Sequence, residues 1–174
     1  MTIRRIDINI FPPFASKISR VWIRRVSLDA MAIGHDGGEQ VAPINDYQLG
    51  VVIADDDTVR RLNNQHRGVD QVTDVLSFST ISQGCWEGDW EPTSKPTGKG
   101  LFLLPPHEPQ PLGEVIISYP QVERQARASG EQIEQELALL LVHGVLHLLG
   151  YDHAEPKEET AMKALEQKAL SRLN

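Results

Sequence analysis

Residues 139–153 read LLLVHGVLHLLGYDH, an apolar segment that carries three histidines. Its hydrophobic character predicts a buried central helix, on which His143 and His147, four positions apart, lie on one face one turn apart. Gly150 suits the left-handed conformation in which many helices end. A turn at this glycine would bring His153 back toward the other two imidazoles. The segment therefore predicts a metal site at the end of a central helix, with His143, His147 and His153 as ligands.

Three imidazoles around one ion, with a fourth position open, are typical of a catalytic zinc site. A single histidine on an apolar helix is usually a packed core residue. Three of them are harder to explain as packing, because each would need its own buried hydrogen-bond partner. Imidazole also suits copper, nickel and iron. The sequence therefore predicts one transition-metal ion, with Zn²⁺ as the first choice and other metals left open.

The residue after the first histidine separates this motif from that of the metalloproteases. Those enzymes carry a glutamate there, which acts as the general base for the metal-bound water. In this chain the position is Gly144, which has no side chain. The group that activates or steers a nucleophile must come from elsewhere, and the pattern disfavours a peptidase.

The rest of the chain alternates between strand and helix patterns. Ile6, Ile8 and Ile10 alternate with polar residues, as on a half-buried strand. The acidic run at 55–57 precedes a helical pattern, so we interpret it as a helix cap rather than a metal site. Further strands are expected at 47–54, 74–78 and 113–118, and helices at about 14–32, after the acidic run, and at 119–129, 131–149 and 156–173.

Composition favours one compact domain over residues 1–174, since the chain is 40% hydrophobic. No apolar run approaches the roughly 20 residues that span a bilayer, and the N-terminus lacks the apolar segment of a secretory signal. The only cysteine, Cys85, makes no internal disulfide, which fits a reducing cytoplasm. Cys85 could be a nucleophile or a fourth metal ligand. We interpret it as an exposed residue without such a role, because its neighbours supply no activating base.

The net charge of −7 argues mildly against nucleic-acid binding, because phosphate contacts need cations. RNA needs only a local basic groove, however, and the charge of the whole chain does not decide the matter. Basic residues gather in the N-terminal third, while much of the acid lies in the last third. We interpret most of these side chains, basic and acidic, as solvated helix faces. The basic set comprises Arg4, Arg5, Lys17, Arg20, Arg24 and Arg25.

The segment 143–153 resembles the signature of the YbeY family, bacterial single-strand-specific endoribonucleases that act in ribosomal RNA maturation. Two further blocks are similar to family segments. The first is LNNQHR at 62–67, followed by TDVLSF at 73–78, and the second is LGEVIIS at 112–118. The order of these blocks along the chain makes the match close.

The resemblance implies an α+β fold, with a small mixed sheet of about four strands packed with about five helices that cover one side of it. It implies single-stranded RNA and ribosomal RNA as partners, with small ribosomal subunit proteins as further candidates. Arg67 falls where the family places its functional arginine, so the resemblance assigns it the catalytic role of stabilising charge on the phosphoryl oxygens. His66 is left out, because adjacent residues on a helix do not share a face.

Two features leave alternatives open. The segment at about 82–111 is a long, divergent loop whose tryptophans, Trp86 and Trp90, could stack on unpaired bases or belong to an insertion without function. Asp152 could orient a histidine or be a simple turn residue.

Three functions therefore compete. The first is a metal-dependent endoribonuclease that acts in ribosomal RNA maturation and ribosome quality control. The second is a non-catalytic ribosome assembly factor with a structural metal. The third is a metal-dependent hydrolase of another substrate, which Gly144 disfavours.

Overall fold

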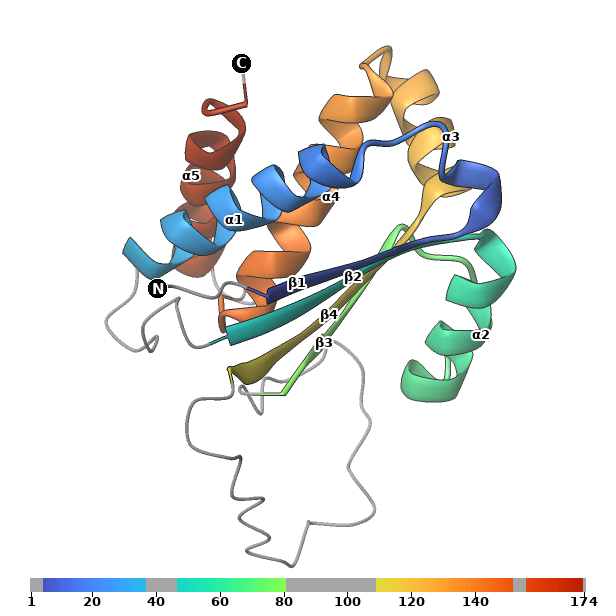
Figure 1. Ribbon diagram of the computed structural model, residues 1–174, viewed down its shortest axis with the longest axis horizontal. Coiled ribbons are helices and arrows are strands. Elements are labelled where there is room, and N and C mark those ends of the chain that lie inside the picture. Colours follow the sequence, from blue (N-terminus) through green and yellow to red (C-terminus); the bar gives the residue numbers. More distant parts are fainter. Residues whose placement is uncertain (1–4, 37–46, 81–108, 152–155, 174) are drawn as a thin grey trace, which may run out of the picture.

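Four strands form the sheet of the protein, whose computed structural model describes residues 5–36, 47–80, 109–151 and 156–173 (Figure 1). The strands are β1 (Arg5–Ile10), β2 (Tyr47–Ala54), β3 (Val75–Ser79) and β4 (Gln110–Ser118). The helices are α1 (Arg20–Asp36), α2 (Asp56–Arg67), α3 (Tyr119–Ser129), α4 (Ile133–Leu148) and α5 (Pro156–Leu170), with a 3-10 turn at Pro12–Phe14.

The sheet has the strand order β1-β2-β4-β3. β1 pairs with β2 and β2 with β4 in parallel, whereas β3 runs antiparallel to β4. In the part of the chain that the structure describes, a mixed sheet of four strands with five helices confirms the expected α+β class. β1 and β3 are the two edge strands, so each can border a site at one side of the sheet.

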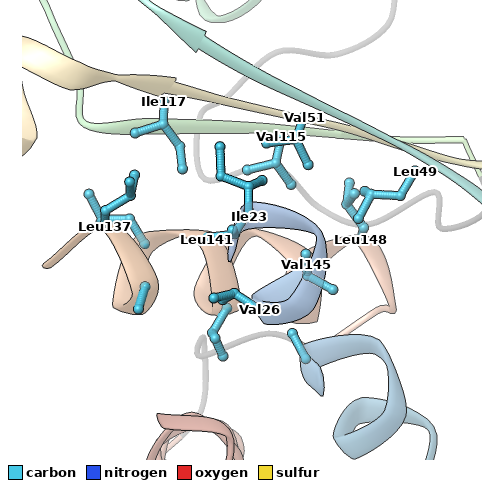
Figure 2. Close-up of a cluster of buried hydrophobic side chains, with 14 of the residues drawn as sticks. Ile23, Val26, Leu49, Val51, Val115, Ile117, Leu137, Leu141, Val145 and Leu148 are labelled. Carbon is cyan, nitrogen blue, oxygen red and sulfur yellow. The ribbon is translucent and has the colours of Figure 1, made fainter. Parts of the chain in front are cut away.

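The main core lies between the sheet and α1, α4 and α5. Val115 and Ile117 of β4 face the helices in this core, and Leu141 and Val145 of α4 pack there with Ile23 of α1 (Figure 2). All five side chains are essentially inaccessible to solvent. Burial of each contributes about 1.5–3 kcal/mol relative to exposure. This packing holds α4 across the sheet and fixes the histidines that it carries.

The central helix α4 packs against the sheet and against α1, α3 and α5. Its apolar residues are buried all round by these neighbours, which explains why it is so hydrophobic. Among the described residues, no helix combines the length and the apolar character needed to cross a membrane.

Helix α2 lies on the opposite face of the sheet, which corrects the expectation that helices cover one side only (Figure 1). Ile116 and Leu76 point away from the main core and form a second cluster with Val59 of α2. The reason is the two-residue period of a strand, since every second side chain of β4 faces this side. An apolar residue such as Ile116 would be exposed without α2.

The ends of α2 follow the sequence signals. The Asp55 carboxylate accepts a hydrogen bond from the backbone N–H of Thr58 at 2.8 Å, so the acidic run caps the helix as expected. Hydrogen bonding to Thr58 holds the pKa of Asp55 below its usual value. Gly68, at a φ of 68°, ends the helix directly after Arg67.

Several expected boundaries were wrong. The first helix ends at Asp36 rather than at 32 and the last at Leu170 rather than at 173, and two larger differences have a clear physical reason. The helix expected from residue 14 begins at Arg20, because Phe14 ends a 3-10 turn and is buried against the Tyr119 ring, 5.0 Å away between centroids. The expected loop at 82–111 ends earlier, because Gln110 and Pro111 belong to β4. Residues 81–108, which include Cys85 and both tryptophans of that loop, lie outside the described residues.

Candidate metal centre

Two of the three expected ligands meet on α4. The Nε2 atoms of His143 and His147 lie 3.0 Å apart, and the ring centroids are separated by 4.5 Å. Both side chains are half-buried. The helical spacing read from the sequence therefore places both imidazoles on one face of α4, with the same ring nitrogen of each directed to a common point.

Glu166 of α5 fixes the orientation of the first histidine. Its Oε1 lies 2.7 Å from Nδ1 of His143, and its side chain is only 13% exposed. When Nδ1 donates its hydrogen to this carboxylate, Nε2 carries the lone pair that a metal needs. A carboxylate behind a ligating histidine is the usual partner in such sites, where it also raises the basicity of the ligand.

The sequence interpretation missed Glu166 and considered only Asp152 for this role, which lies outside the described residues. A signal was present in the helix pattern. Met162 and Ala169 are the buried residues of α5, and Glu166 falls four positions after the first and three before the second. A glutamate in the apolar stripe of a helix is unusual and indicates a buried partner.

The end of α4 confirms the predicted turn. Gly150 has a φ of 95° and donates to the carbonyl of His147 at 3.0 Å, while Tyr151 N–H donates to Leu146 at 3.1 Å. This pair of bonds is the Schellman arrangement, which reverses the chain after a helix. The Tyr151 hydroxyl then donates to the carbonyl of Gly34 at 2.6 Å and ties the turn to α1.

His153, the third expected ligand, comes three positions after Gly150 and lies outside the described residues. Within the described part of the chain, no group of three or more His, Cys, Asp or Glu side chains is arranged to hold a metal ion. The complete ligand set therefore stays a prediction.

Gly144 is closed off by the sheet. A Cβ at this position would lie 2.7 Å from Cγ1 of Val115 and 3.1 Å from Oγ of Ser77. Real Cβ atoms do not approach a buried carbon so closely, so even alanine requires the strand to move. A glutamate cannot occupy the place that the general base of a metalloprotease holds.

The two described histidines fit a metal ion. Two nitrogens bound to one tetrahedral zinc, each about 2.0–2.1 Å from it, lie about 3.3 Å apart. The observed separation of the Nε2 atoms is 3.0 Å. Two imidazole nitrogens, with a carboxylate bound to the other nitrogen of His143, are the chemistry that zinc and similar ions prefer.

Arg67 is the last residue of α2 and is half-buried. Its helix and the histidine helix approach the edge strand β3 from opposite faces. Leu76 of β3 packs in the α2 cluster, whereas Ser77 points to Gly144 of α4. Arg67 therefore lies on a helix, α2, that contacts the same edge strand, β3, as the histidine helix α4. That its guanidinium lies close to the histidines stays a prediction.

A charged contact holds α2 in place at its other end. Arg124 of α3 donates to both oxygens of Asp56 at 2.8 and 2.9 Å, and the buried Ser118 hydroxyl donates to Asp56 at 2.6 Å. The hydrogen bonds from Arg124 and Ser118 hold the pKa of Asp56 below its usual value, although burial acts against them. Asp56 therefore joins α2 to β4 and α3, and so sets the position from which Arg67 extends.

Comparisons with known proteins place the chain among the endoribonucleases, enzymes that hydrolyse RNA. A family model described as Endoribonuclease YbeY matches residues 26–174. The chain is 38% identical over 172 residues to the Endoribonuclease YbeY of Dehalococcoides mccartyi strain CBDB1, covering 98% of this chain and 95% of the relative. It is also 38% identical over 171 residues to that of Roseiflexus sp. strain RS-1, with 98% and 93% covered.

The fold is similar to the solution structure of TM1509 from Thermotoga maritima, with a TM-score of 0.55 and 25% sequence identity. The match covers 95% of this chain and 86% of that chain. The chain belongs to the YbeY family, as its sequence blocks led us to expect.

Proposed function

We propose that this endoribonuclease is metal-dependent, cuts single-stranded RNA, and acts in ribosomal RNA maturation and ribosome quality control. The observation that carries the proposal is the convergence of the His143 and His147 Nε2 atoms, 3.0 Å apart, with Glu166 behind the first ring. Such a pair with a carboxylate partner is typical of a metal site rather than of a packed core.

His143, His147 and His153 are the proposed ligands of one Zn²⁺ ion. A bound zinc ion lowers the pKa of its water toward neutrality and polarises a phosphoryl oxygen. Glu166 keeps the His143 ring in the tautomer that leaves Nε2 as an acceptor. The turn at Gly150 is the element that would return His153 to the pair, and Tyr151 anchors this turn to α1.

Arg67 is the proposed catalytic residue. Cleavage of an RNA phosphodiester bond adds negative charge to the phosphoryl oxygens, and a positioned guanidinium stabilises that charge. Its planar group can hold two oxygens at once, which an ammonium group cannot do. The Asp56 contact with Arg124 supports this role, because it fixes the helix that ends at Arg67.

Single-stranded RNA is the proposed substrate, and ribosomal RNA its cellular source, with small ribosomal subunit proteins as candidate partners. We propose that the protein acts in the cytoplasm, where its proposed substrate, ribosomal RNA, is found. The competing peptidase function is disfavoured, because Val115 and Ser77 fill the place of a general base beside Gly144.

The test is cleavage of a labelled single-stranded RNA by the purified protein, before and after treatment with a chelator. We expect cleavage that the chelator abolishes and added Zn²⁺ restores, with a duplex of the same sequence cut far more slowly. The His143→Ala variant, prepared in parallel, controls for contaminating nucleases. If the wild type cleaves no RNA with metal bound, the function as an assembly factor with a structural metal is favoured instead.

A further inference from the structure

A cleft with a volume of about 460 Å³ lies at the β1 edge of the sheet. Its walls come from β1, β2 and β4 and from the first turns of α1. None of its lining residues belongs to the histidine site, so the cleft requires an explanation of its own. The polar lining consists of Asp7, Asn9, Arg20, Arg24 and Glu114.

The floor of the cleft is a row of three residues in register across three strands. Asp7 pairs with Gly50, and Gly50 pairs with Glu114. Because residues in register project to the same face, the two carboxylates flank a glycine. A Cβ at Gly50 would lie 2.9 Å from Cγ of Glu114 and 3.3 Å from its Oε1. The glycine therefore lets the Glu114 side chain lie across the sheet, inside the cleft.

The rim of the cleft is basic. Arg20 and Arg24 are one turn apart on α1, and both are exposed. Arg20 donates to the carbonyl of Ile8, which holds its guanidinium at the edge of β1. Among the described residues, neither arginine forms an ion pair with Asp7 or Glu114. The cleft therefore presents charges of both signs without a direct ion pair between them, and Asp7 accepts a hydrogen bond from Gln48.

A ligand for this cleft needs anionic groups for the arginines and N–H donors for the carboxylates. A nucleotide has both, since its phosphate pairs with guanidinium groups and the amino group of its base donates to a carboxylate. Guanine offers two adjacent N–H donors to the two oxygens of one carboxylate, whereas uracil offers one. The volume lies within the roughly 300–1,000 Å³ typical of small-molecule sites.

We propose that this cleft binds one nucleotide of the RNA substrate and prefers guanine. Arg20 and Arg24 hold the phosphate, and Glu114 contacts the base edge that carries the amino group. Reading the edge of an unpaired base is the usual way in which proteins recognise single-stranded RNA. The proposal rests on the RNA-hydrolysing activity of the family and not on the metal, so the two can fail separately.

The test follows the backbone amides of the full chain by NMR, with a chelator present so that no metal contributes. Guanosine 5′-monophosphate, uridine 5′-monophosphate and inorganic phosphate are titrated in turn. We expect guanosine monophosphate to shift the amide signals of Asp7, Gly50 and Glu114. We also expect it to bind about tenfold more tightly than uridine monophosphate, because it makes one more hydrogen bond to a charged carboxylate. Equal shifts with phosphate alone would show an adventitious ion only, and absence of shifts at these amides would overturn the proposal.

Two variants separate the roles of the rim and the floor. Arg24→Glu should lower the affinity for both nucleotides about tenfold, because it removes a contact to the phosphate. Glu114→Gln should remove most of the preference for guanine, because guanine loses two hydrogen bonds to a charged carboxylate, and should change the binding of uridine monophosphate much less. Arg127→Glu and Glu131→Gln, which change exposed charges elsewhere in the same way, are the matched controls. The proposal is contradicted if Glu114→Gln keeps the full preference for guanine. It is also contradicted if Arg127→Glu weakens nucleotide binding as much as Arg24→Glu does.

Discussion

The contact between Glu166 and His143 gives the sharpest test of the metal centre. Its donor–acceptor distance of 2.7 Å is that of a strong hydrogen bond to a charged group, and Glu166 is 13% exposed. Glu166→Gln keeps the size of the side chain and an oxygen that can accept from Nδ1, but removes the charge. We expect the affinity for Zn²⁺ to fall about 10- to 100-fold, the usual effect of losing such a partner.

The same variant should change the stability of the metal-free protein only slightly. Glutamine retains a neutral hydrogen bond, so we expect a loss of about 1 kcal/mol in the free energy of unfolding. Glu166→Ala leaves the ring without its acceptor and should cost about 1–3 kcal/mol. Urea unfolding of the metal-free protein measures both values.

Isothermal titration of zinc into the metal-free protein measures the affinity. Glu159→Gln is the matched control, because it makes the same change on α5 at an exposed residue paired with Lys163. The control should bind zinc as the wild type does. If Glu166→Gln also binds zinc with unchanged affinity, Glu166 does not orient a metal ligand, and the contact with His143 only stabilises the fold.

Three further predictions concern the surroundings of the site. Gly144→Ala should lower the free energy of unfolding by about 1–3 kcal/mol through overpacking, and in urea unfolding the double variant with Val115→Ala should lose less stability than the two single variants together. Asp56→Asn should destabilise the protein at neutral pH. Because the pKa of Asp56 is lowered in the folded state, its contribution is present above the unfolded value of 3.8 and is lost as the pH falls through the folded pKa, so wild type and variant should converge in acid unfolding. Arg67→Ala should reduce RNA cleavage roughly 100-fold or more with metal content unchanged, and Arg67→Lys should restore only part of the rate. Cleavage by Arg67→Ala at the wild-type rate would remove this arginine from the catalytic set.

Local signals in the sequence predicted both bounds of two elements correctly. The strand at 47–54 and the helix at 119–129 have the expected bounds. The helix begins after Ser118, whose hydroxyl accepts from Gln121 N–H, and ends at Gly130, with a φ of 75°. The pairing of His143 with His147 was equally predictable. Caps, glycine turns and helical spacing act over a few residues, so one segment contains all the information that they need.

The sequence by itself determined the two central histidines, the turn after them and the family to which the chain belongs. Only the tertiary structure decided that Glu166 stands behind His143, that Val115 closes the space beside Gly144, and that α2 covers the opposite face of the sheet. Each of these depends on two segments far apart in the chain. The packing of the helices on the sheet decides which of these side chains come into contact. A protein interior is close-packed, so few other arrangements of the same side chains fit.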